Sequence, residues 1–313
     1  MHTVTQTQSW HRLIRTAGML ALCLIAPLAM AGTPAQQSFA SAEAGVSALV
    51  DAVKTNDLKM LQAILGPRSY KLVNSGDEVA DTQRREAFIR EYDEASRIVF
   101  DGETKATLAI GDDEWPLPIP LVRSGGRWRF DTRQGEREIL ARRIGSNELA
   151  AIQVCLAIVD AEHEFATQVR TGNDVRQYAA RFVSTPGSHD GLYWEAQGGD
   201  PPSPLGPLLA AAATEGYAKS EPRVLAPYHG YYYKILTSQG PDAPGGAYDY
   251  LVREKMIGGF AVLAYPARYG ASGVMSFMVN YEGVVFEKNL GRKTTTAAAD
   301  MTTFNPDAGW KKQ

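Results

Sequence analysis

The spacing of apolar residues changes period repeatedly along this chain, and this pattern constrains the fold more than any single motif. Apolar residues recur at helical spacing between residues 46 and 99 and alternate with polar residues between 106 and 131. Helical spacing returns at 147–169, and strand-like segments follow at 231–288. A period near 3.6 indicates an amphipathic helix, whereas a period of two indicates a half-buried strand. Helices followed by strands, twice over, predict an α+β fold with two domains.

The first predicted domain, residues 42–133, begins with helices. One helix is expected from Val46 to Leu65, where Gly66-Pro67 ends it, and a second is expected to be capped by Asp81. The apolar face of the second helix is predicted to consist of Phe88, Ile89, Tyr92, Ala95, Ile98 and Val99.

Strands should complete this domain. Three prolines between residues 116 and 120 favour extended backbone, and Ser124-Gly125-Gly126 is a turn signal. The strand after the turn should place Trp128 and Phe130 on one face. Helices followed by a curved antiparallel sheet resemble the cone of nuclear-transport-factor-like (NTF2-like) domains.

A connecting helix is predicted over residues 134–146, with a break at Gly145 and a new cap at Ser146 or Asn147. The second domain, 147–313, should pack a long helix on an antiparallel β-meander. Its strands are expected at Tyr231–Leu236, Met256–Tyr265, Val274–Tyr281 and Val284–Lys288. This plan resembles type IV pilins, although a pilin helix starts at the mature N-terminus and this helix is internal. Phe304 and Trp310 are expected to cover the sheet.

The N-terminus has the pattern of a secretory signal peptide over residues 1–31. Arg12 and Arg15 precede an apolar run that ends in Ala29-Met30-Ala31, which predicts export and Sec-type cleavage before Gly32. Residues 32–41 would then form a flexible leader. Lipidation at Cys23, or retention of the leader as an uncleaved anchor, are alternatives. After cleavage no membrane span is expected, so the protein would be periplasmic or extracellular.

Composition argues against several partners and chemistries. The net charge of −3 becomes more negative without the leader, which gives no support for a nucleic-acid partner. Cys155 would be the one remaining cysteine, so no internal disulfide is possible and a buried, inert thiol is expected. No zinc-ligand spacing, phosphate loop or serine-hydrolase elbow is present, so we predict no metal, no cofactor and no catalytic residue.

Aromatic residues are dense in the second half and indicate a ligand-binding surface, because aromatic faces with polar neighbours hold sugars, peptides and flat ligands. An aromatic-rich sheet core is the alternative interpretation, since tyrosine favours strands. The candidate binding residues are His189, Trp194, Tyr228, His229, Tyr231, Tyr233, Tyr265, Arg268 and Tyr269.

Several blocks, including Gly125–Asp131, Arg142–Leu149, Pro227–Leu236 and Tyr265–Gly270, resemble a family of exported bacterial proteins, the domain-of-unknown-function family numbered 2950. The resemblance covers nearly the whole mature chain and implies no activity, cofactor or catalytic residue.

These patterns together predict an exported, non-catalytic binding or interaction protein of the cell envelope, whose partner is an envelope component or a small ligand. A competing hypothesis is an envelope hydrolase that uses His189 or His229 with Asp190 or Asp249 as its carboxylate. A pilus-like assembly subunit is a third possibility, and it would polymerise.

Overall fold

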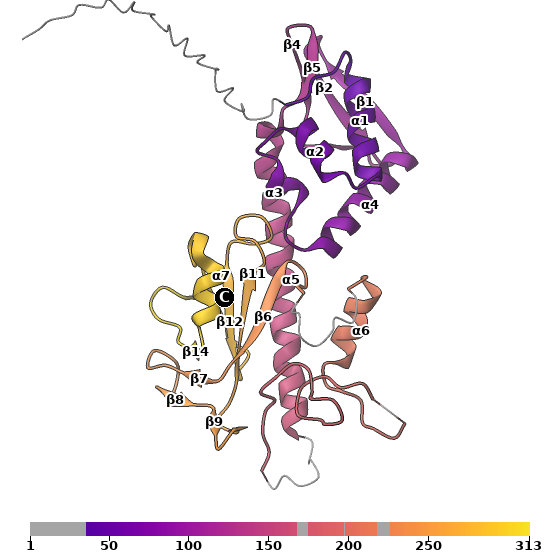
Figure 1. Cartoon of the computed structure of the whole chain (residues 1–313). Helices are drawn as coiled ribbons and strands as arrows, with labels where there is room; N and C mark the ends of the chain where they lie inside the picture. Colours follow the sequence, from indigo (N-terminus) through magenta and orange to yellow (C-terminus); the bar gives the residue numbers. More distant parts are fainter. Residues whose placement is uncertain (1–35, 168–174, 197, 218–225) are drawn as a thin grey trace, which may run out of the picture. The chain divides into compact units, whose positions relative to one another are not determined.

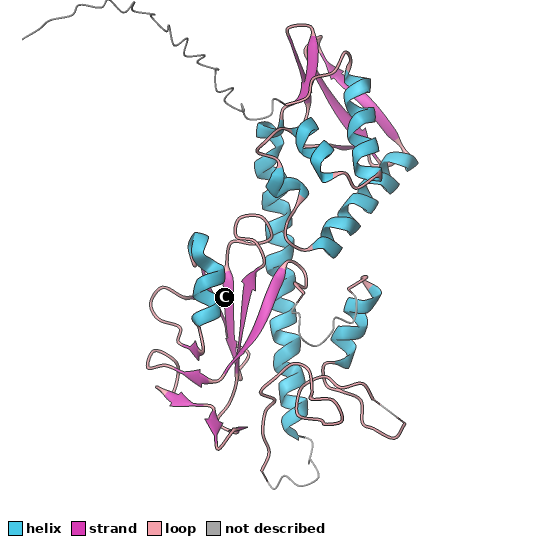
Figure 2. Cartoon of the chain, in the orientation of Figure 1, coloured by secondary structure: helices cyan, strands magenta, loops and turns pink. Residues whose placement is uncertain are grey.

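The computed structural model describes residues 36–167, 175–196, 198–217 and 226–313. Helices and antiparallel sheets occur in separate blocks, which confirms the α+β class (Figures 1 and 2). The buried apolar side chains form two hydrophobic cores, one drawn from residues 39–130 and one from residues 151–310. The predicted signal peptide lies outside the described residues, and the predicted domain boundaries stay a prediction.

The first core lies between helices and one face of a sheet. The helices are α1 (Ala42–Lys54), α2 (Leu58–Leu65), α3 (Tyr70–Val73) and α4 (Glu78–Glu94). The sheet runs in the order β1-β2-β4-β5, with β3 also paired to β2. Its strands are β1 (Ser96–Asp101), β2 (Lys105–Ile110), β3 (Trp115–Pro116), β4 (Leu121–Ser124) and β5 (Arg127–Phe130).

The predicted hairpin joins β4 and β5. Gly125 and Gly126 have φ angles of 59° and 76°, a region that glycine enters without steric cost. Trp128 and Phe130 are buried in the first core, as expected. Trp128 also pairs with Phe39 through two backbone hydrogen bonds. Residues 36–41 are therefore packed against the sheet, and the prediction of a flexible leader is wrong for them.

The single helix expected from Val46 to Leu65 is two helices. Asn56 has a φ of 52°, which ends α1, and Asp57 accepts the N–H of Met60 to start α2. Polar residues at 55–57 were the available signal, but the apolar stripe continues across them and hides the turn.

The second helix also differs from its prediction at both ends. Asp77, not Asp81, caps α4, because its side chain accepts the N–H of Ala80. Ile98 and Val99 lie in β1, where they pair with β2. Apolar residues near a helix end are compatible with both a helix and a strand. Here the pairing of β1 with β2 places Ile98 and Val99 in a strand.

Helix α5 (Thr132–Thr167) is continuous through Gly145, so the predicted break and the new cap at Ser146 or Asn147 are wrong. A glycine inside a helix costs about 1 kcal/mol relative to alanine, which packing can offset. Helix α5 contacts α3 on one side of this position and β6, β11 and β12 on the other. It is long and apolar enough to cross a membrane by length and composition, a property that core helices share.

The second core lies on an antiparallel sheet in the order β15-β13-β12-β11-β6. Helix α5 covers one face, and α7 (Thr294–Asp300) covers the other (Figure 1). The strands are β6 (Tyr231–Leu236), β11 (Ala261–Pro266), β12 (Ser276–Asn280), β13 (Val285–Lys288) and β15 (Lys311–Lys312). Phe304 and Trp310 are buried here as predicted, and so is the free thiol of Cys155.

Smaller elements complete this half. They are α6 (Gly206–Thr214), the 3-10 turn η1 (Gly291–Lys293), and short strands β7 (Ser238–Gln239), β8 (Tyr248–Asp249), β9 (Leu251–Val252), β10 (Lys255–Met256) and β14 (Thr303–Phe304). The strand expected from Met256 to Tyr265 is interrupted at Gly258-Gly259. A Cβ atom on Gly258 would lie 2.9 Å from the carbonyl oxygen of Asp249, so glycine permits a close backbone approach there.

Candidate functional site

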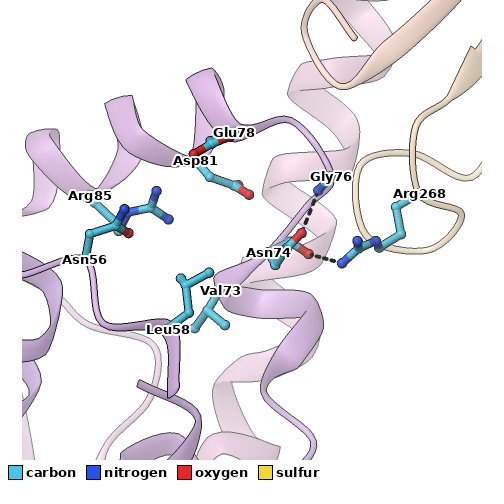
Figure 3. A pocket seen from close by; sticks show the side chains of 9 residues that line it. All are labelled: Asn56, Leu58, Val73, Asn74, Gly76, Glu78, Asp81, Arg85 and Arg268. Atoms are coloured by element: carbon cyan, nitrogen blue, oxygen red, sulfur yellow. Dashed lines mark hydrogen bonds between the residues drawn. The ribbon is translucent and has the colours of Figure 1, made fainter. Parts of the chain in front are cut away.

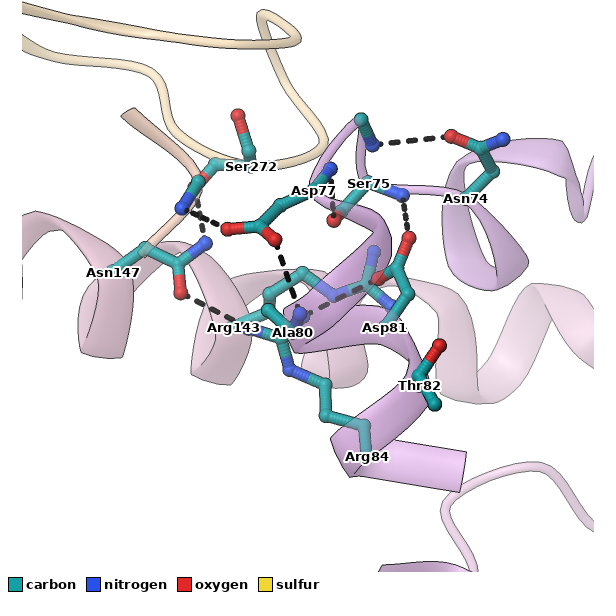
Figure 4. Close-up of polar contacts among 12 residues, drawn as sticks. Asn74, Ser75, Asp77, Ala80, Asp81, Thr82, Arg84, Arg143, Asn147 and Ser272 are labelled. Carbon is teal, nitrogen blue, oxygen red and sulfur yellow. Dashed lines mark hydrogen bonds and ion pairs between the residues drawn. The ribbon is translucent and has the colours of Figure 1, made fainter. Parts of the chain in front are cut away.

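A buried carboxylate at the start of α4 joins three segments that are far apart in the sequence. Asp77 is 1 % exposed, and its Oδ1 atom accepts the N–H of Ala80 at 3.0 Å. Its Oδ2 atom accepts the N–H of Gly230 at 2.7 Å and the hydroxyl of Tyr217 at 2.9 Å. Asp77, whose bond to Ala80 is drawn in Figure 4, therefore holds the chain after α6 and the chain before β6 against the first turn of α4.

A second chain of polar contacts runs beside it, from α4 through α5 to the loop after β11 (Figure 4). Asp81 accepts the N–H of Ser75 at 2.7 Å through Oδ2 and pairs with Arg84 at 3.3 Å through Oδ1. Arg84 donates to Oδ1 of Asn147 at 3.0 Å, and Asn147 donates to the carbonyl of Ser272 at 2.8 Å. Asn147 thus bridges the two halves from inside α5 and does not act as a helix cap.

Arg143, one turn earlier on α5, secures the short helix α3. It donates to the carbonyl of Lys71 at 2.7 Å and to the carbonyl of Leu72. Burial and the nearby charge of Arg84 lower the pKa of Arg143 to about 10, so the guanidinium stays charged at neutral pH. These charge-assisted bonds hold the α3 end of the first half against α5.

A cavity of about 370 Å³ opens beside this junction. Its volume lies within the range of small-molecule sites, about 300–1,000 Å³. Arg85 and Arg268 approach it from opposite sides with Asp81 between them (Figure 3). We call it the junction pocket, and its lining residues are Asn56, Leu58, Val73, Asn74, Gly76, Glu78, Asp81, Arg85 and Arg268.

Arg268 is the predicted site residue that reaches this pocket. It comes from the loop after β11 and donates through Nη1 to the carbonyl of Asn74 at 3.1 Å (Figure 3). Its guanidinium lies 4.9 Å from the ring centroid of Tyr70, a cation–π distance. Its backbone N–H donates to Oγ of Ser272 at 2.9 Å. The side chain is thus held by the first half and the backbone by the second.

His229 lies close to Asp77 in a cluster of aromatic and acidic side chains. Its φ is 50°, its Nε2 lies 3.4 Å from Oε2 of Glu215, and its N–H donates to the hydroxyl of Tyr217. The ring of Tyr228 lies 4.1 Å from the His229 ring. Burial, the charge of Glu215 and a hydrogen bond to it raise the pKa of Tyr228 to about 12. The tyrosine stays neutral at any physiological pH.

His189 has a different environment. Its ring stacks on Trp194 at 4.4 Å, and its Nε2 lies 3.7 Å from Oδ2 of Asp200. The carboxylate proposed for it from the sequence, Asp190, instead accepts bonds from the Thr185–Ser188 turn and pairs with Arg181. The two histidines therefore contact different carboxylates, Asp200 and Glu215, and Asp249 lies exposed in strand β8.

The predicted tyrosines are not gathered on one exposed face. Tyr231 is fully buried, and its hydroxyl donates to the carbonyl of Met275, so this ring belongs to the core. Burial raises the pKa of Tyr233 well above its usual value. Tyr265 is partly exposed and packs against Tyr232, and Tyr269 is partly exposed in the loop that carries Arg268. The structure thus distributes these residues between the core and several surface positions.

Within the described ranges, no group of three or more His, Cys, Asp or Glu side chains is arranged to hold a metal ion. A family model described as "Protein of unknown function (DUF2950)" matches residues 36–313. The chain belongs to this family. The DUF2950 match includes both cores, the Asp77 contacts and the junction pocket. Neither the curated proteins nor the solved structures gave a match, so the resemblances to NTF2-like domains and pilins stay predictions.

Sequence reasoning missed most of the DUF2950 junction. Asp77, Arg85 and Asn147 carry no recognisable spacing, because each is a common polar residue on or beside a helix. The run Asn74-Ser75-Gly76-Asp77 before a helical segment was the one available signal, since such residues are frequent at helix starts. It locates a helix cap, but nothing in it indicates the distant segments that the cap binds.

Proposed function

We propose that this protein is exported and acts outside the cytoplasm as a non-catalytic binding protein, with the junction pocket as its ligand site. The observation that carries the proposal is the pocket itself, where Arg268 meets Asn74, which follows α3, and polar side chains of α4 in a cavity of about 370 Å³. The residues that form it are fixed by buried contacts of Asp77, Asp81 and Arg143. A pre-formed cavity with a few held polar groups is the usual form of a small-molecule site.

The contacts of His229 favour binding over hydrolysis. The side chains that contact the His229 ring are Glu215, Tyr217 and Tyr228. In the described part of the chain, the His229 ring does not contact a serine or cysteine that it would activate as a nucleophile.

The leader supports the export part of the proposal, since residues 1–31 have the signal-peptide pattern and the family match starts after them. The intact mass of the protein recovered from an envelope fraction checks this, and we expect it to lack residues 1–31. Full-length protein in the cytosol would contradict it.

Ligand binding is best tested by thermal unfolding of the chain from residue 32 with a panel of sugars, amino acids, short peptides, organic acids and polyamines. A ligand present at 100 times its Kd stabilises the folded state by about 2.7 kcal/mol, which raises Tm measurably. Leu58→Trp fills the pocket, whereas Met60→Trp adds the same ring to the exposed side of α2.

We expect at least one class of ligand to raise the Tm of the unsubstituted protein and of Met60→Trp, with the shift lost in Leu58→Trp. A panel without any shift, or shifts of the same size in both variants, would overturn the proposed pocket function.

A further inference from the structure

Of the acid and amide side chains that line the junction pocket, Asp81 and Asn74 are already engaged by the protein itself. Asp81 already accepts hydrogen bonds on both oxygens, from Ser75 and Arg84, and its charge is balanced by Arg84. Asn74 accepts the N–H of Gly76 through Oδ1 at 3.0 Å and the guanidinium of Arg268 through its carbonyl. These groups shape the pocket wall and leave little acceptor capacity for a ligand.

The two arginines are in the opposite situation. Arg85 makes one side-chain hydrogen bond, from Nη2 to Oγ1 of Thr82 at 3.0 Å. Arg268 makes one, to the carbonyl of Asn74, while its face rests on Tyr70. Most N–H donors of both guanidiniums are therefore without an acceptor in the described part of the chain. Neither guanidinium forms an ion pair with a described carboxylate, so both present an unpaired positive charge to the pocket from opposite sides (Figure 3).

We propose that the junction pocket binds a small anion whose carboxylate or phosphate oxygens are held by Arg85 and Arg268; this inference rests on the proposed binding function. Planar guanidiniums bind such oxygens through paired, charge-assisted hydrogen bonds. Leu58 and Val73 add apolar surface to the wall, and the volume of about 370 Å³ limits the ligand to a compact molecule. Such a ligand would also draw together Arg85 of α4 and Arg268 of the second half.

Glu78 is the lining group that opposes this charge preference. It is exposed and lies in the first turn of α4, and its side chain makes no hydrogen bond to another described residue. An anion in the pocket is repelled by this carboxylate, so its neutralisation should strengthen binding. A residue with only a structural role would not produce that gain.

The test measures binding of citrate and of pyrophosphate by calorimetry to the chain from residue 32, with sorbitol and spermidine as neutral and cationic probes at matched ionic strength. Arg85→Gln and Arg268→Gln should each weaken anion binding by about tenfold, the effect of losing a charge-assisted hydrogen bond. Arg90→Gln on the exposed side of α4, and Arg292→Gln in η1, should bind as the unsubstituted protein does. Glu78→Gln should bind about threefold more tightly.

Binding of citrate, pyrophosphate or both with this ranking supports the inference, and the preferred probe identifies the source of the oxygens. Anion binding that is equal in Arg85→Gln and Arg90→Gln, or a Glu78→Gln variant that binds more weakly, would overturn it. Pocket-dependent binding of sorbitol or spermidine without the anions would also overturn it and leave the binding function standing. If no probe of any charge binds and the wider panel also fails, both proposals fall.

Discussion

At the scale of single residues, Glu162 is a carboxyl group in a buried environment. It is fully buried on α5, where its Oε2 atom accepts the N–H of Ala179 at 2.8 Å. In the part of the chain that the structure describes, its Oε1 atom has no hydrogen-bond partner. Burial raises the pKa of Glu162 to about 8, against the partial opposing effect of the Ala179 bond. Folding therefore favours the protonated acid.

This pKa predicts that stability falls as pH rises from about 5 to 8. In that window the folded state keeps a proton on Glu162. In the unfolded chain the pKa of this group is 4.5, so the proton has been released. The folded state binds more protons, so the free energy of unfolding decreases with pH, with a contribution of about 1.4 kcal/mol per pH unit from this group. Urea unfolding at several pH values measures the slope.

Glu162→Gln replaces the titratable carboxyl group with a neutral amide, so it should flatten the dependence of the free energy of unfolding on pH. Glu164→Gln, on the exposed side of the same helix, should leave it unchanged. Tyr178 and His163 lie near Glu162, but Tyr178 titrates above the window because burial and the Glu162 charge raise its pKa. The same pH slope in all three proteins would show that Glu162 is charged in the folded state.

At the scale of elements, the two glycines of α5 have opposite environments. A Cβ atom on Gly145 would meet nothing within 4 Å, whereas one on Gly135 would lie 2.4 Å from the carbonyl oxygen of Pro118. Gly135 thus allows the start of α5 to approach the segment before β4. At Gly145 no close neighbour requires a glycine.

Substitution of each glycine by alanine should separate these roles. Gly145→Ala should raise the free energy of unfolding by about 0.5–1 kcal/mol, because alanine favours the helix and restricts the unfolded chain. Gly135→Ala should lower it by about 1–3 kcal/mol, because a backbone atom must move. Equilibrium unfolding in urea checks both, and a loss of stability in Gly145→Ala would indicate that α5 bends at this position.

For the molecule as a whole, Asp77 connects three parts of the chain that the structure describes. It binds its own helix, Tyr217 after α6 and the segment before β6. The part of the chain that forms the first core is therefore joined to the part that forms the second core by hydrogen bonds as well as by α5. A buried donor left without its acceptor costs about 1–3 kcal/mol.

Asp77→Ala should destabilise the protein by about 3 kcal/mol or more, since Ala80, Gly230 and Tyr217 all lose a buried acceptor. Asp57→Ala is the matched control, because Asp57 also caps a helix but accepts only the N–H of Met60 at an exposed site. Its loss should cost about 1 kcal/mol. Equal losses in urea unfolding would mean that Asp77 acts as a helix cap alone.

The sequence by itself determined the α+β class, the hairpin at Gly125-Gly126, the strands β6, β12 and β13 and the burial of Phe304 and Trp310. The physical reason is that period and turn chemistry are local. A buried strand face must repeat every second residue, and a tight turn needs residues that accept positive φ.

Tertiary structure alone decided which aspartate caps α4, the continuity of α5 and the position of the junction pocket. The Asp77–Gly230 hydrogen bond joins residues 153 positions apart, and the Arg268–Asn74 bond spans 194 positions. Helix and strand periods carry no information about such pairs. A polar side chain next to a helix becomes a cap, a bridge or a pocket wall only when distant backbone packs against it, because the free energy of its hydrogen bonds depends on that burial.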